Sequence, residues 1–209
     1  GQLGEAAPIG AVGIGAVILA SIYWIFGFLR MGTSGLVAQA HGAGDTGESG
    51  AHLARALGIG LAAGLALILL HVPIFAGAFR LAPASPEVET LARQYLAIRI
   101  WGAPATIALY AITGWLIAIE RTRSVLVLQL LMNGLNVALD LWFVLGLGWG
   151  VGGVALATLI AEWSGLVLGL IFARHALHAA LRQGRILARE LLAELVRVNG
   201  DILIRSVLL

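Results

Sequence analysis

The sequence predicts an all-α integral membrane protein, folded as a polytopic helical bundle. Of its 209 residues, 60% are hydrophobic and 11% are charged, whereas a soluble domain is usually about half apolar and about a quarter charged. The apolar residues form segments of about 20 residues or more, which is enough for a helix to cross the hydrocarbon core of a bilayer. Strands of a membrane β-barrel would instead alternate over segments of about 10 residues, and the sequence shows no such alternation.

Five apolar segments follow one another along the chain, separated by polar or glycine-rich breaks. They are predicted at 7–40, 52–79, 87–119, 124–145 and 151–174, before an amphipathic connector at 175–194 and a sixth segment that begins near 195. The break before the third segment contains a helix start. Ser85 is expected to cap this helix, because Pro86 follows at the first helical position and Glu87 lies in the first turn.

The arginines indicate how the segments are oriented in the membrane. Six of the 13 follow the third or the fifth segment: Arg121, Arg123, Arg174, Arg182, Arg185 and Arg189. Arg55 follows the first segment, whereas Arg80 lies on the opposite side, with Arg93 a little inside the next helix. By the positive-inside rule, the first, third and fifth segments then end in the cytoplasm. Gly1 would lie outside, and we therefore expect one further membrane helix to precede it.

The composition argues against several classes of function. There is no cysteine, so neither a disulfide framework nor a thiolate metal site is possible. The arginines form no basic stripe of the kind that binds nucleic acid. The histidines form no HExxH motif, and the spacing of Gly27 and Gly32 lacks the Lys-Ser/Thr of a P-loop. We expect no enzyme activity and no cofactor.

The fourth segment carries a polar face inside the membrane. With 3.6 residues per turn, one narrow side of this helix collects Gln129, Asn133, Asn136 and Asp140. An aspartate at the bilayer centre costs about 2.5–3.5 kcal/mol on insertion scales. Amides suffice to join helices by hydrogen bonds, which is the simpler interpretation of Gln129 and Asn133. A carboxylate beside an amide instead predicts a site for a proton or a small hard cation such as Na⁺.

Two other segments also carry polar faces. On the third segment one face collects Tyr95, Arg99, Gly102, Thr106 and Thr113. Pro104 on the same segment favours a bend in the helix. On the fifth segment Thr158 and Glu162 share a face, and Glu162 either points inward or pairs with an arginine near the cytoplasmic end. The sequence alone leaves both alternatives open.

Several of these stretches together resemble one family. They are WIFGFLRMGT at 24–33, YLAIR at 95–99, GAPA at 102–105, NVALD at 136–140, GLGWGV at 146–151 and ALAT at 155–158. The chain resembles the multidrug and toxic compound extrusion (MATE) transporters, in their bacterial DNA-damage-inducible branch. The resemblance covers essentially the whole chain.

The resemblance implies twelve helices in two six-helix lobes. Residues 1–187 would then be the N-terminal transmembrane lobe without its first helix, together with a cytoplasmic connector, and residues 188–209 the start of the C-terminal lobe. It further implies a cation site made of Asp140, Asn136 and Thr158, with Tyr95 nearby and an aspartate on the first helix. Na⁺ at Asp140 is the only metal ion that it implies.

The function implied by the resemblance is secondary antiport at the bacterial inner membrane: export of amphipathic, often cationic, compounds in exchange for H⁺ or Na⁺. Candidate residues lining the substrate cavity are Asn133, Gln129, Arg99 and Thr106. The expected partners are membrane lipid and a small-molecule substrate, with no nucleic acid and no obligate protein partner. The alternatives are a flippase of the same superfamily for a lipid-linked precursor and a structural membrane subunit that transports nothing.

Overall fold

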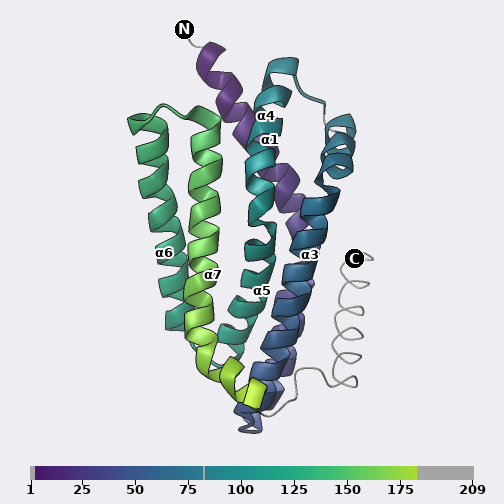
Figure 1. The fold of residues 1–209 in the computed structure, drawn as a ribbon, viewed down its shortest axis with the longest axis vertical. Coiled ribbons are helices and arrows are strands. Elements are labelled where there is room, and N and C mark those ends of the chain that lie inside the picture. The colour runs from purple at the N-terminus through teal and green to yellow at the C-terminus, as the bar shows by residue number, and fades with distance from the viewer. Residues whose placement is uncertain (1–2, 82, 183–209) are drawn as a thin grey trace.

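The chain folds into a bundle of long helices that run roughly along one axis (Figure 1). The computed structural model describes residues 3–81 and 83–182. In chain order the elements are α1 (Leu3–Trp24), α2 (Gly27–Gly42), α3 (Thr46–Leu81), α4 (Pro86–Arg99), the 3₁₀ turn η1 (Ile100–Gly102), α5 (Ala103–Ala118), α6 (Thr122–Asp140), the π-helical turn η2 (Leu141–Gly146) and α7 (Gly150–Arg182). The predicted all-α class is confirmed.

Within these described residues, five helical stretches are long and apolar enough to cross a membrane. They are Ala6–Gly42, Thr46–Leu81, Pro86–Ala118, Thr122–Gly146 and Gly150–Arg182. The five predicted segments are therefore confirmed, with differences at two of their bounds. α3 begins at Thr46, inside the polar break that was predicted to precede residue 52, because Asp45 caps its first turn by accepting the Glu48 backbone N–H. α7 does not end at Arg174 but continues to Arg182, so the first part of the predicted connector belongs to this helix. The rest of the connector, the segment near 195 and the boundary at 187/188 lie outside the described residues.

Local chemistry accounts for where the third stretch begins and where it is interrupted. Ser85 caps α4 as predicted, because its hydroxyl accepts a hydrogen bond from the Val88 N–H at 3.5 Å. The 3₁₀ turn η1 lies directly before the start of α5, where Pro104 removes a backbone donor. The polar face of the third stretch is thereby divided between α4 and α5.

The third stretch lies at the centre of the bundle, and the fourth lies at its edge. Inside the third stretch 72% of the most apolar window is buried, against 6% in the fourth. α5 packs closely on α3 and α2 through glycines: a Cβ on Gly64 would collide with the backbone of Pro104, and one on Gly114 with the backbone of Arg30. Small residues of this kind let helix backbones approach each other. α6 packs chiefly on α7 (Figure 1).

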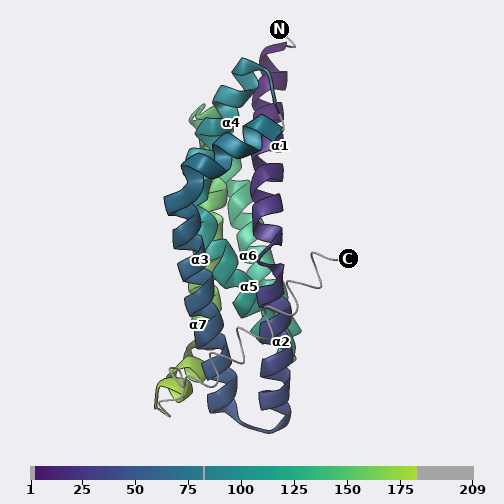
Figure 2. The same cartoon turned by 90° about the vertical axis from the view of Figure 1, so that its right-hand side faces the viewer.

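Charge gathers at one end of the bundle. The turn between α2 and α3 and the C-terminal part of α7 lie together at this end (Figure 2). Arg121 and Arg123 flank the start of α6, and Arg174 and Arg182 are exposed on α7. At the opposite end lie Arg80, exposed in the last turn of α3, and Arg93, which pairs with Glu89 at 2.6 Å. This asymmetry fits the orientation expected from the sequence, with the end that holds the α2–α3 turn in the cytoplasm.

Candidate functional site

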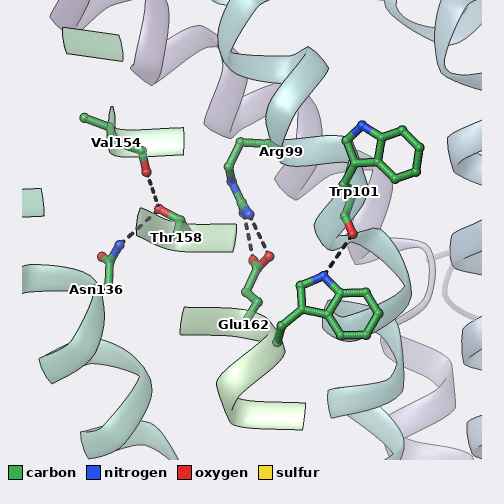
Figure 3. Close-up of polar contacts among 7 residues, drawn as sticks. Arg99, Trp101, Asn136, Val154, Thr158 and Glu162 are labelled. Carbon is green, nitrogen blue, oxygen red and sulfur yellow. Dashed lines mark hydrogen bonds and ion pairs between the residues drawn. The ribbon is translucent and has the colours of Figure 1, made fainter. Parts of the chain in front are cut away.

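A polar contact joins α6 to α7 inside the membrane-spanning part of the bundle. The Asn136 side-chain amide donates a hydrogen bond to the Thr158 hydroxyl at 3.1 Å, and that hydroxyl donates to the Val154 carbonyl at 3.0 Å (Figure 3). Both side chains are half-buried. Because the Thr158 hydroxyl donates its hydrogen to the Val154 carbonyl, its oxygen accepts the hydrogen bond from Asn136. Two of the predicted cation-site residues are therefore in direct contact.

Asp140 lies one helical turn beyond Asn136, at the last position of α6. Its Oδ1 atom is buried and has no hydrogen-bond partner among the described residues. The helix changes to the wider π form at the next residue, Leu141, and such π turns occur frequently at functional sites. A buried carboxylate oxygen without a partner is rare in folded proteins and calls for an explanation. A bound proton or cation would provide one.

The other two polar residues of α6 lie on an open surface. Gln129 and Asn133 are exposed, and so are most side chains of this helix. The described chain does not cover this face of α6. The proposed roles of Gln129 and Asn133 as cavity-lining residues therefore stay predictions.

A buried ion pair connects α4 to α7. The Arg99 guanidinium donates two hydrogen bonds to the Glu162 carboxylate, at 2.6 and 2.7 Å (Figure 3). Both residues are buried, with 6% and 8% of their surface exposed. A bidentate geometry is the strongest form of such a pair. Of the two alternatives for Glu162, the interior position is correct, and its partner is an arginine within the bundle rather than one at the cytoplasmic end.

Tyr95 and Arg99 line a cavity of about 290 Å³ between α1, α4 and α5. Its other lining residues are Ala16, Leu19, Ala20, Tyr23, Trp24 and Tyr110. Two buried polar atoms of the lining residues have no hydrogen-bond partner within the described chain: the Tyr23 hydroxyl and the Arg99 Nε. The Thr106 hydroxyl on α5 is likewise buried without a partner in the described chain, but Thr106 is not among the residues that line this cavity. The cavity therefore combines aromatic walls with unused polar groups, a combination typical of small-molecule sites.

The predicted site residues thus fall into two neighbouring groups. Asn136 and Thr158 are in contact, and Asp140 follows on the same helix, whereas Tyr95 belongs to the cavity beside the Arg99–Glu162 pair. α7 connects the two groups, because Thr158 and Glu162 lie one turn apart on it. The sequence analysis did not pair Glu162 with Arg99. The feature that could have suggested this pair is that the two opposite charges each lie on the polar face of an otherwise apolar segment.

The described part of the chain brings no three histidine, aspartate or glutamate side chains together as candidate metal ligands. A divalent metal centre is therefore not indicated by these residues. Oxygen atoms from Asp140, Asn136 and Thr158 are instead the ligand type that hard cations prefer.

Comparison with known proteins gives consistent matches. The MatE family model matches residues 1–142. The chain is similar to DNA damage-inducible protein F of Escherichia coli strain K12, with 37% identity over 100% of this chain and 46% of that protein. It is also similar to the probable multidrug resistance protein NorM of Agrobacterium fabrum strain C58, with 31% identity over 74% of this chain and 35% of that protein.

A solved structure shares the fold. It is the outward-facing conformation of a multidrug resistance MATE family transporter of the MOP superfamily, with 25% identity and a TM-score of 0.80. The match covers 96% of this chain and 48% of that one. The chain therefore spans about half the length of the relatives it matches, or less.

Proposed function

Because the chain belongs to the MatE family of transporters, we propose that it forms one lobe of a secondary active antiporter in the bacterial inner membrane. The antiporter exports amphipathic, often cationic, compounds and takes up H⁺ or Na⁺ in return. The observation that carries this proposal is the buried Asp140 Oδ1 without a partner, one turn from the Asn136–Thr158 contact.

The ion is bound by oxygen atoms from two helices. Asp140 supplies the charge, and Asn136 and Thr158 supply neutral oxygens. The amide of Asn136 already donates its N–H to Thr158 at 3.1 Å, so its carbonyl oxygen is the atom left to accept or to coordinate. Binding a cation neutralises the carboxylate, whose charge is costly in the membrane. Whether the ion site is occupied therefore changes how α6 packs against α7, and in this way ion binding is coupled to a conformational change.

The substrate is recognised by polar groups set in aromatic and apolar walls. The proposed substrate contacts are Tyr95 and Arg99, which line the cavity, together with Thr106 on α5 and with Asn133 and Gln129 on the open face of α6. Because Glu162 neutralises Arg99, the cavity has no strong net positive charge. This argues against a flippase for an anionic lipid-linked precursor, which would favour a more basic cavity, and agrees with export of cationic compounds.

Dye efflux from cells tests the proposal. The protein is expressed from its complete gene, and wild type is compared with Asp140→Asn at several external pH and Na⁺ values. We expect the variant to lose efflux while reaching the membrane in normal amounts. The wild-type ion dependence then identifies the coupling ion.

A matched control removes an acid that is not part of the site. Glu87 is exposed at the start of α4, and Glu87→Gln should leave efflux unchanged. Undiminished, ion-dependent efflux in Asp140→Asn would move the coupling site to another residue. Absence of efflux in the wild type, for every dye and ion tried, would instead favour the structural-subunit alternative.

A further inference from the structure

A second cavity, independent of the transport site, lies at the arginine-rich end of the bundle. It measures about 330 Å³ and is enclosed by the ends of four helices and by the turn before α6. Its polar lining residues are His41, Thr46, Ser49, Trp115, Arg121 and His175, and the apolar ones are Ile119, Phe172, Ala176 and Ala179. None of these described lining residues is a carboxylate. The cavity is therefore lined by hydrogen-bond donors and basic groups.

The hydrogen bonds around the cavity leave several donors free to face a ligand. Ser49 is buried and accepts the Trp115 indole N–H at 3.1 Å, so its own hydroxyl proton can be donated. The Nε2 atom of His175 accepts a hydrogen bond from Arg174 at 3.2 Å, which places the His175 proton on Nδ1. Together with the Arg121 guanidinium these groups suit an oxyanion such as phosphate.

The acids near this cavity are engaged elsewhere. Glu48 contacts His52 at 3.2 Å and Arg55 at 3.5 Å. Asp45 accepts the Glu48 backbone N–H at 2.9 Å and so caps the start of α3. Glu120 is exposed beside Arg121 but does not line the cavity. None of these three acids is among the residues that line the cavity.

An apolar groove lies between α6 and α7, along the part of α7 that precedes the cavity. It is lined by Leu131, Leu159, Ile160, Trp163, Ser164, Val167, Leu168 and Ile171. Leu168 and Ile171 lie one helical turn before Phe172 and His175 of the cavity, so the end of the groove adjoins the cavity along α7. At 1.5 Å per residue the groove extends about 18 Å along α7, slightly more than half of the roughly 30 Å hydrocarbon core.

We propose that the cavity and the groove together bind an anionic phospholipid of the cytoplasmic leaflet. The phosphate lies among Arg121, His41 and His175, and one acyl chain follows the groove along α7. Basic pockets between membrane helices on the cytoplasmic side bind lipid headgroups in this way. The length of the groove matches one leaflet, which a free phosphate ion would not need.

Native mass spectrometry of the purified protein in detergent tests the headgroup. The probe is phosphatidylglycerol, compared with phosphatidylethanolamine of the same acyl chains. We expect the wild type to retain phosphatidylglycerol preferentially, and the double variant Arg121→Gln/His175→Gln to bind it at least about fivefold more weakly. The matched control is Arg123→Gln, an exposed arginine two residues away that does not line the cavity. An equal loss in this control, or no preference in the wild type, would overturn the proposal.

A second pair of measurements separates a lipid from a free anion. Ser164→Trp fills the groove without touching any cationic group, and it should weaken phosphatidylglycerol binding while excess inorganic phosphate displaces little of the lipid. If inorganic phosphate displaced the lipid efficiently and Ser164→Trp had no effect, the cavity would be a site for free phosphate and the lipid assignment would be wrong.

Discussion

At the scale of single residues, the Arg99–Glu162 pair makes the sharpest prediction about stability. Removing one partner of a buried ion pair leaves an uncompensated charge and costs about 3–5 kcal/mol, whereas replacing both by apolar residues of similar volume is often neutral. We expect Glu162→Gln to lower the midpoint of thermal unfolding in detergent strongly. The double variant Arg99→Met/Glu162→Met should recover most of the loss.

The Arg93–Glu89 pair is the matched control for this experiment. Its shortest nitrogen–oxygen distance is also 2.6 Å, but both Arg93 nitrogens contact the same Glu89 oxygen and the arginine side chain is 47% exposed. Exposed pairs contribute about 0–1 kcal/mol, so Glu89→Gln should change the unfolding midpoint little. If Glu162→Gln and Glu89→Gln were equally stable, the buried pair would not stabilise the packing of α4 on α7.

Replacing Thr158 by valine tests whether its hydroxyl serves stability or ion binding. Thr158 accepts from Asn136 at 3.1 Å, and hydrogen bonds between membrane helices contribute about 0.6 kcal/mol on average. Thr158→Val should therefore cost little stability and yet reduce efflux, because an ion ligand is lost. An unfolding loss large enough to explain the reduced efflux would contradict the ligand role.

Thr106 on α5 provides a comparison with Thr158, because its buried hydroxyl makes no hydrogen bond within the described chain. Replacing this hydroxyl by a methyl group therefore removes a desolvated polar atom at no cost in contacts. We expect the unfolding midpoint of Thr106→Val to equal or exceed that of the wild type, as measured by the same thermal assay. A clear fall would mean that the hydroxyl has a partner, such as a bound water.

At the scale of helices, the close approach of α3 to α5 depends on glycine. A Cβ at Gly64 would overlap the backbone of Pro104, which cannot move aside as a side chain could. Gly64→Ala should lower stability by about 1–3 kcal/mol, the usual cost of overpacking. Gly58 lies on the same helix with nothing within 4 Å of its added Cβ, and Gly58→Ala should be neutral or stabilising. Equal effects of the two substitutions would show that α3 and α5 pack less closely than described.

The helices themselves were largely predictable, because each depends on local composition and spacing. The apolar lengths predicted all five membrane stretches, and the Ser85-Pro86 cap predicted the start of α4. The Arg99–Glu162 contact was not predictable, because its two residues are 63 positions apart and meet only through the packing of α4 on α7. The end of α7 was missed because polar side chains at a helix end are equally compatible with a loop.

At the scale of the whole molecule, the chain corresponds to half or less of each relative it matches. Of the four polar residues on one side of α6, Gln129 and Asn133 are exposed within the described chain, whereas Asn136 and Asp140 are half-buried. It was predictable from sequence that Asn136 and Asp140 lie close together, because they are one turn apart on the same helix. Thr158 was predicted from the resemblance; the structure shows that it contacts Asn136 at 3.1 Å, and its role as an ion ligand stays a prediction.

The central claim is that Asp140 couples ion uptake to export, and reconstitution tests it most directly. The protein, expressed from its complete gene, is placed in liposomes, and a H⁺ gradient or a Na⁺ gradient is imposed separately while transport of a cationic dye is followed. We predict that one of the two gradients drives wild-type transport and that Asp140→Asn responds to neither. Gradient-driven transport that persists at the wild-type rate in Asp140→Asn would contradict the account.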